Sequence, residues 1–298
     1  MIAPIKVSAT EDGTRLYRFL LRHYPGSNMI LVRRLCRSGE IRVNSKRCGE
    51  NATLKSGDLV RVPPVIQNRR TETARTGFSL ADLEKLRQRI IHDDEDVVVF
   101  DKPAGMAAQG GGGIRKPLDK MAAALFPNDT VLLVHRLDKE TSGIIVVAKN
   151  HAAAQKLARD FQTKDVKKTY IALLAGGVRP KKGIIDEPVD GKKAVTRYDV
   201  LGELKDYLSF VRFSPETGRK HQLRVHSAGA LGAPIVGDDV YGSRRLDGKL
   251  KTVLSPNRLH LFASKITFRH PKTGKLLTIS AAVPEWLRSV ADLCDVRL

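Results

Sequence analysis

The stretch HRLDKETSG, from His135 to Gly143, is the part of the chain around which the predicted fold is organised. An apolar run at residues 131–134 precedes it, and a β-branched run at residues 144–148 follows it. Apolar runs of this length that end at turn residues are typical of buried strands. We therefore expect the polar stretch to form a loop at the ends of sheet strands, where rigid scaffolds present catalytic groups. Asp138 is the candidate acid of this loop.

The composition indicates a polyanionic partner. The chain has 298 residues, with 52 Lys and Arg against 32 Asp and Glu, and a formal net charge of +20. Such an excess is the electrostatic footprint of nucleic-acid binding. An acidic membrane surface would instead require a basic amphipathic helix or a lipidation signal, and neither pattern occurs in the sequence. Hydrophobic residues make up 42% of the chain, which is enough for a packed core and argues against a disordered basic tail.

Cysteine usage and hydropathy predict a cytoplasmic protein. The three cysteines, Cys36, Cys48 and Cys294, contain no Cys-x-x-Cys pair and indicate neither a zinc site nor a disulfide framework. Reduced thiols suit the cytosol. We expect no signal peptide and no membrane span, because no apolar run approaches about 18 to 20 residues.

The first 70 residues hold 14 Lys and Arg against 5 Asp and Glu, a net charge of +9. Residues 15–24 predict a helix, and a second helix is predicted to end near Arg37, where Ser38 and Gly39 stop it. Clustered cations gain affinity for RNA by releasing counterions from its phosphates. The candidate RNA contacts on these helices are Arg15, Arg18, Arg22, Arg33, Arg34 and Arg37.

A compact β unit follows these helices, and Pro63-Pro64 closes it. Two arginine-bearing helices before a small β unit resemble the RNA-binding domain first described in ribosomal small-subunit protein four. Residues 37–44 (RSGEIRVN) and 55–58 (KSGD) carry this resemblance. Residues 65–78 lack periodicity and predict a linker, after which Ser79 can cap a short helix.

Two further polar segments predict turns rather than ligand sites. The consecutive acids of residues 93–96 lack the alternating spacing of a calcium loop, so we expect a solvated turn before a strand at 97–100. The glycines at 110–113 are followed by Ile114 and then Arg-Lys-Pro, not by the Gly-Lys-Ser/Thr ending of a nucleotide-binding loop. They predict a mobile backbone that RNA can approach closely.

A second polar cluster, TGRKHQLRVH, occupies residues 217–226. Leu223 and Leu231 fit one face of a helix that would carry Arg219 to Arg224 in its first turns. Cations there face the positive end of the helix dipole, so an anion is expected opposite them, either an RNA phosphate or Asp138.

These motifs together resemble the ribosomal large-subunit pseudouridine synthases, most closely their synthase C branch. The shared elements are DKPAG at 101–105, HRLD through TSG at 135–143, KTY at 168–170 and the cluster at 217–226. Four positions depart from the usual family residues, and we expect none of them to touch the chemistry. They are Glu140 for Asp, Lys220 for Thr or Ser, Gln109 for His, and Ala233 for His.

The resemblance implies an α+β fold with an RNA-binding domain at residues 12–65, a linker and short helix at 66–89, and a catalytic domain at 90–298. The catalytic domain would hold a mixed, mainly antiparallel β-sheet flanked by helices. The implied activity is conversion of uridine to pseudouridine in 23S ribosomal RNA, free or in a large-subunit assembly intermediate. Neither a cofactor nor a metal is implied, and we expect a monomer.

Each site residue takes its role from the same resemblance. Asp138 would attack the uracil or the sugar carbon, or abstract a sugar proton, and Arg224 would pair with it. Tyr170 would stack on the uracil and could take part in the final proton removal. Arg136 would fill the space that the flipped base leaves. Arg219 and Lys220 are further candidate RNA contacts.

Two other functions compete with this reading. A non-enzymatic ribosome-assembly factor could use the same basic surface, but phosphate binding alone needs no acid such as Asp138 with Tyr170 and Arg224. A glycosidase acting on a nucleic-acid base would release free uracil. His135, His221, His226 and His260 are expected to be structural hydrogen-bonding residues, since no partners with metal spacing accompany them.

Overall fold

The computed structural model describes residues 4–24, 29–63, 78–111, 113–204, 207–242, 254, 258–293 and 296. The chain divides into two compact units, residues 1–88 with 120–130 and residues 89–119 with 131–298. Most of the predicted linker lies outside the described residues. Its described part is helix α4 (Leu80–Arg87), where the Ser79 hydroxyl accepts a hydrogen bond from the N–H of Asp82, as its capping role predicts.

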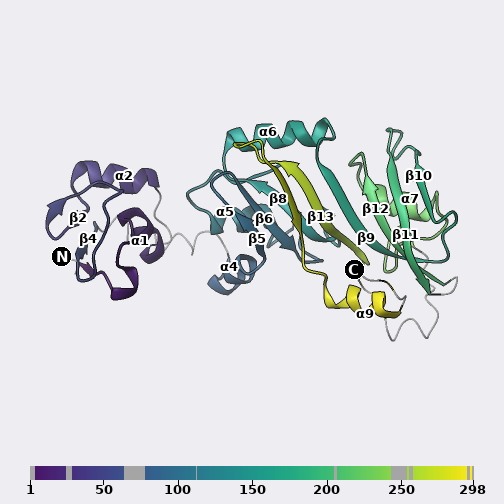
Figure 1. The fold of residues 1–298 in the computed structure, drawn as a ribbon, viewed down its shortest axis with the longest axis horizontal. Helices are drawn as coiled ribbons and strands as arrows, with labels where there is room; N and C mark the ends of the chain where they lie inside the picture. Colours follow the sequence, from purple (N-terminus) through teal and green to yellow (C-terminus); the bar gives the residue numbers. More distant parts are fainter. Residues whose placement is uncertain are drawn as a thin grey trace. The chain divides into compact units, whose positions relative to one another are not determined.

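The first unit begins with two helices and a small sheet (Figure 1), and it also includes α4 and most of α5 (Leu118–Leu125). As predicted, α1 (Leu16–His23) and α2 (Met29–Ser38) come first. The sheet order is β1-β4-β2-β3, and all its pairs are antiparallel. Its strands are β1 (Ile5–Lys6), β2 (Arg42–Val43), β3 (Lys46–Arg47) and β4 (Leu59–Arg61). A 3-10 turn, η1, spans Ala9–Glu11.

Amphipathic spacing explains the core of this unit. Leu16, Phe19 and Leu20 of α1 are fully buried, because positions three and four apart share one helix face. They pack with buried residues of α2 and the sheet, including Val32 and Val60. The arginines of both helices stay exposed.

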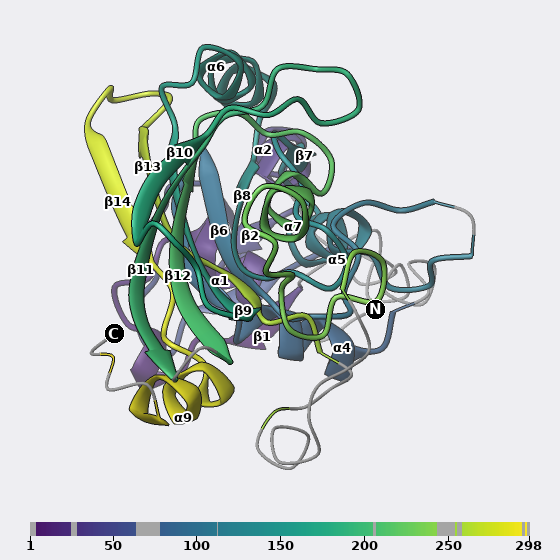
Figure 2. The same ribbon diagram turned by 90° about the vertical axis from the view of Figure 1, so that its right-hand side faces the viewer.

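The second unit is built on a large sheet in the order β10-β11-β12-β9-β13-β8-β6-β5, with β14 beside β13 and β7 beside β8. Its helices are α6 (His151–Gln162), α7 (Gln222–Ala228) and α9 (Glu285–Leu293). In both views of the ribbon, α6 and α9 lie at opposite ends of this sheet (Figures 1 and 2), and residues of both helices pack into one apolar cluster. The strands are β5 (Ile90–Asp93), β6 (Val97–Lys102), β7 (Leu132–Leu133), β8 (Ser142–Ala148), β9 (Lys167–Ala175), β10 (Lys182–Ile185), β11 (Thr196–Leu204), β12 (Leu208–Pro215), β13 (Leu261–Arg269) and β14 (Leu276–Ser280).

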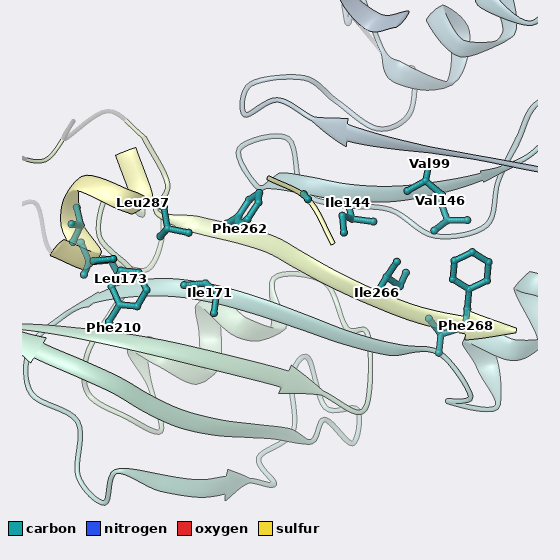
Figure 3. Close-up of a cluster of buried hydrophobic side chains, with 14 of the residues drawn as sticks. Val99, Ile144, Val146, Ile171, Leu173, Phe210, Phe262, Ile266, Phe268 and Leu287 are labelled. Carbon is teal, nitrogen blue, oxygen red and sulfur yellow. The ribbon is translucent and has the colours of Figure 1, made fainter. Parts of the chain in front are cut away.

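Strand β13 joins the two halves of the large sheet. It pairs with β9 in antiparallel and with β8 in parallel orientation, and the latter is the one parallel pair among the described strands. Figure 3 shows Phe262, Ile266 and Phe268 of β13 among apolar side chains from β8 and β9. This mixed, mainly antiparallel sheet with flanking helices confirms the α+β prediction.

Most predicted elements of the second unit are present, with local differences. Asp190 and Gly191 form a tight turn between Val189 and Lys192, and both turn residues have positive φ. The strand predicted at 131–134 is present as β7, which spans two residues. The prediction that it is buried is wrong, because both residues are half-buried. The acidic turn begins later than predicted, since residues 92 and 93 belong to β5. Among the described residues, no helix is long and apolar enough to cross a membrane.

Candidate active site

The loop that carries Asp138 is fixed to the sheet at its far end. Gly143 has φ +106, and a Cβ atom there would lie 2.3 Å from the carbonyl oxygen of Ala263, so only glycine fits. Ala263 of β13 pairs with Gly143 of β8 on one side and with Tyr170 of β9 on the other. The sheet therefore brings the Asp138 loop next to Tyr170.

A buried lysine fixes the same loop from the other side. Lys102 is fully buried, and its Nζ donates to the carbonyl oxygens of Pro103 (3.1 Å), Met106 (2.8 Å) and Lys139 (3.0 Å). Burial lowers the pKa of Lys102 to about 8. Sequence reasoning grouped this lysine in a shared motif without a role, and the structure shows that it holds the backbone directly after Asp138.

Asp138, Tyr170 and Arg224 line one cavity of about 200 Å³. Pockets for drug-sized ligands are larger, roughly 300 to 1,000 Å³, so the cavity suits a single base. Half of its remaining polar lining residues are cationic. The cations among the lining residues are Arg136, Lys168, Arg219 and Lys220, with Arg224. The structure thus brings together the three predicted catalytic residues and three of the predicted RNA contacts.

Arg224 has a different partner from the predicted one. Its Nε and Nη2 atoms each donate to Asp238 at 2.7 Å, and Nη2 lies 3.3 Å from Asp239. The Oδ1 atom of Asp138 instead lies 3.8 Å from Nε2 of His221. The predicted direct pair of Arg224 with Asp138 is therefore wrong in this structure. The sequence motif ends before Asp238, so it could not reveal this partner.

The Arg224–Asp238 pair is buried, with side chains 5% and 0% exposed. Hydrogen bonds to Asp238 raise the pKa of Arg224, and the charge of Asp138 raises it further. Burial would raise the pKa of Asp238, but Arg224 and the backbone N–H groups of Val240 and Tyr241 hold it below its ordinary value. Both charges are thus kept, and the guanidinium is fixed in orientation at the cavity wall.

Tyr170 lies on β9 with its ring at the cavity. Burial, with the Asp138 charge as a smaller cause, raises the pKa of Tyr170 well above its ordinary value. The phenol is therefore neutral at physiological pH. Such a ring can stack on a base, but it is a poor acceptor of protons.

A family model for RNA pseudouridylate synthases matches residues 96–229, which include Asp138, Tyr170 and Arg224. Ribosomal large subunit pseudouridine synthase C of Vibrio parahaemolyticus is 35% identical over 300 residues, covering 95% of this chain and 94% of that protein. The protein of the same name from Escherichia coli is 35% identical over 302 residues, covering 95% and 94%. The chain belongs to the RNA pseudouridylate synthase family. It is therefore an enzyme that isomerises uridine in RNA, as its motifs predict.

Solved structures of this synthase family share the fold. Human RNA pseudouridylate synthase domain containing 4 matches with a TM-score of 0.63 at 26% identity, over 76% of this chain and 99% of that one. Human RNA pseudouridylate synthase domain containing 1 matches with a TM-score of 0.54 at 29% identity, over 70% and 87%.

The second polar cluster of this synthase is only partly helical. Helix α7 begins at Gln222, so Arg219 and Lys220 lie before it, and the prediction that they occupy its first turns is wrong. The reason is His221, whose φ of +55 is left-handed and interrupts the helix. Gln222 anchors this bend, because its Oε1 accepts hydrogen bonds from the Thr217 hydroxyl and the Arg219 N–H. Of these three cations, only Arg224 lies in the first turn of α7, near the positive end of the helix dipole, as predicted.

Three of the four singled-out histidines of the synthase are structural, as predicted. The Nε2 of His135 accepts from the N–H of Val146 at 2.9 Å, and burial lowers the His135 pKa to about 3. His226 bonds Thr196 and the carbonyl of Glu187, and His260 bonds the carbonyl of Val236. His221 differs, since it lines the cavity beside the acid. Sequence reasoning missed this position.

One group of described residues has the spacing of metal ligands, and it lies outside the cavity. Asp94, Asp96 and His270 offer ligand atoms within 4.8 Å of one another. Asp94 already accepts hydrogen bonds from the backbone N–H groups of Asp96 and Val97, and its Oδ2 contacts His92 and His270. These contacts give the cluster a structural role, since they hold the turn after β5 against the β13–β14 hairpin.

Proposed function

We propose that this synthase converts specific uridines of 23S ribosomal RNA to pseudouridine, with Asp138 as its catalytic carboxylate and without a cofactor. The observation that carries this proposal is the cavity itself, where Asp138 faces the inside of a base-sized pocket beside Tyr170. The relatives named ribosomal large subunit pseudouridine synthase C support the choice of substrate.

The reaction is an isomerisation with a defined balance of bonds. The bond from uracil nitrogen-1 to the ribose breaks, a bond from carbon-5 to the same sugar carbon forms, the carbon-5 proton leaves, and nitrogen-1 takes up a proton. Asp138 would start this sequence by attacking the uracil or the sugar carbon, or by abstracting a sugar proton. Since Asp138 is half-buried at the cavity wall, an enclosed base would meet it without intervening bulk water.

The neighbours of Asp138 would hold the substrate. Tyr170 would stack on the uracil as a neutral ring, and a base must first leave its helix to reach it. Arg136 is exposed at the cavity rim, where its side chain would fill the space that the flipped base vacates. Arg224, fixed by Asp238, would keep the electric field around Asp138 constant during the reaction.

Cations outside the base pocket would bind the RNA backbone. Arg219 and Lys220 are exposed beside the cavity, and Lys168 lines it with its Nζ 3.4 Å from the Thr217 carbonyl. Residues 12–65 would form the RNA-binding domain, residues 66–89 a linker with a short helix, and residues 90–298 the catalytic domain. The arginines of α1 and α2 would contact phosphates.

This proposal places the synthase in the cytoplasm as a monomer. Its substrate would be free 23S rRNA or a large-subunit assembly intermediate. A map of pseudouridines in ribosomal RNA with and without the gene would identify the modified positions.

Release of hydrogen from uracil carbon-5 tests the reaction. The protein and its Asp138→Asn variant are incubated with 23S rRNA that carries tritium at uracil carbon-5, and released tritium and free uracil are measured. We expect tritium release without free uracil, lost in the variant. Free uracil would indicate a glycosidase, and binding without release would indicate an assembly factor.

A further inference from the structure

The imidazole of His221 lies beside Asp138 in the cavity, and the mechanism above leaves it unused. Its Nε2 lies 3.8 Å from Asp138 Oδ1. Its Nδ1 lies 3.2 Å from the hydroxyl of Tyr241, and the two rings meet edge to face at 5.7 Å. The imidazole is thus held between a tyrosine and the catalytic acid, with 20% of its side chain exposed.

The backbone at His221 is arranged for this position of the ring. Its φ of +55 lies in the left-handed region, which is unusual for a residue with a Cβ atom. His221 is the N-cap residue of α7, yet its side chain makes no capping hydrogen bond. The ring instead lines the cavity, and non-glycine residues in such conformations cluster at functional sites.

The isomerisation needs an acceptor for the carbon-5 proton, and few groups in the cavity can serve. The arginines that line the cavity are always protonated. Tyr170 is a neutral phenol, and Lys168 donates to the Thr217 carbonyl. Asp138 acts on the sugar or the uracil in the preceding step, and a carboxylate is in general a weaker base than an imidazole. Apart from the exposed Lys220, His221 is the remaining ionisable side chain of the cavity, and a neutral imidazole has one ring nitrogen that can accept a proton.

We propose that His221 accepts the carbon-5 proton of the uracil in the last step of the reaction, with Tyr241 holding its ring. This inference rests on the proposed function. Nδ1–H donates to the Tyr241 hydroxyl, which leaves Nε2 with a free electron pair facing the cavity. The carbon-5–hydrogen bond breaks, its electrons restore the ring double bond, and the proton moves to Nε2 and then to water. The Asp138 carboxylate stabilises the imidazolium that forms.

Two labelled substrates separate this role from a structural one. Full-length 23S rRNA is transcribed with ordinary uridine, with uridine deuterated at carbon-5, or with 5-fluorouridine. Deuterium slows the step in which the carbon-5 bond breaks. Fluorine cannot leave as a proton, so 5-fluorouridine reports every step up to formation of the new carbon–carbon bond and nothing after it.

For His221→Gln we expect pseudouridine formation to fall about 10²-fold, the lower end for loss of a general base. The deuterium isotope effect should rise from near 1 in the native protein to about 2 or more. The rate of carbon–carbon bond formation with 5-fluorouridine RNA should stay within about twofold, which also shows that the variant is folded. Tyr241→Phe should give a smaller loss of the same kind. His151→Gln, at an exposed position of α6, is the matched control and should match the native protein.

An unchanged isotope effect in His221→Gln, or an equal slowing with 5-fluorouridine RNA, would overturn the proposal. Either result would assign His221 to positioning Asp138. If the native protein releases no carbon-5 hydrogen from rRNA at all, the proposed function fails first, and the two failures are thereby distinguished.

Discussion

Charged residues do different work in the two units of the molecule. In the first unit, Arg22 and Arg33 are 64% and 49% exposed, and each has one carboxylate partner, Glu11 and Glu50 respectively. In the catalytic cavity, Arg224 is 5% exposed and lies between two carboxylates. Exposed pairs contribute about 0 to 1 kcal/mol each and are screened by salt, whereas a buried pair is costly to break. Substitutions of charged residues in the first unit should therefore have small effects that add up. One substitution of a charged residue in the cavity should have a large effect by itself.

The largest effect is expected at Asp138. Asp138→Asn should lower the rate of pseudouridine formation by at least about 10⁴-fold, as for other essential catalytic groups. The thermal stability of the variant should change little, because the Asp138 side chain is 21% exposed and its contact with His221 spans 3.8 Å. Tritium release and circular dichroism would measure the two quantities. Activity within tenfold of the native protein would remove Asp138 from the chemistry.

The next effect concerns the buried pair. Asp238→Asn leaves the Arg224 guanidinium without its main partner and should cost about 3 to 5 kcal/mol of stability, measured by urea unfolding. The double variant Arg224→Met, Asp238→Leu should recover much of that stability but not the activity. If Asp238→Asn costs under about 1 kcal/mol, the contrast between the cavity and the first unit fails.

The pH dependence of stability at Lys102 tests the same contrast between exposed and buried charges. Lys102→Met removes the donor to three carbonyl oxygens and should cost roughly 1 to 3 kcal/mol at neutral pH. The folded-state pKa of about 8 lies below the ordinary 10.5, so the unfolded chain binds more protons between these values. Native stability relative to the variant should therefore rise from pH 8 towards 10.5, by about 3 kcal/mol at most. If the difference in stability between the native protein and the variant stays constant or narrows over this range, the result would contradict the burial of a charged amine.

The smallest effect is expected on α2. Arg34→Gln with Arg37→Gln removes two exposed cations and should reduce the slope of log affinity for rRNA against log salt by about 1.5. Filter binding at several salt concentrations measures this slope. Lys275→Gln with Arg269→Gln, which removes the same charge from exposed positions of the second unit, should leave it unchanged. Equal slopes for both variants would argue against α1 and α2 as the RNA anchor.

Local patterns in the sequence predicted the helices well. Helix α6 (His151–Gln162) also follows from local sequence, since its apolar spacing is regular and Asn150 caps it through the N–H of Ala153. Strands β1 and β3 were missed, because two residues are too few to show an alternating pattern. The early start of the second polar helix was wrong because helical spacing does not reveal the left-handed backbone at His221.

The candidate site was predicted in its members but not in its pairing. Motif resemblance placed Asp138, Tyr170 and Arg224 together, and all three line one cavity. Asp238 and Lys102 act through contacts between residues far apart in the chain, with a buried carboxylate and with backbone carbonyls respectively. No local periodicity encodes such contacts, so they became visible only in three dimensions.

Strand β13 also sets the order of events during synthesis of the chain. Asp138 and Tyr170 leave the ribosome early, but the strands next to them, β8 and β9, are joined through Ala263. The ribosome must therefore release almost the whole chain before the cavity can close. Until residues 261–269 emerge, β13 cannot join β8 to β9, so the acid and the aromatic ring lie on two unjoined sheet edges.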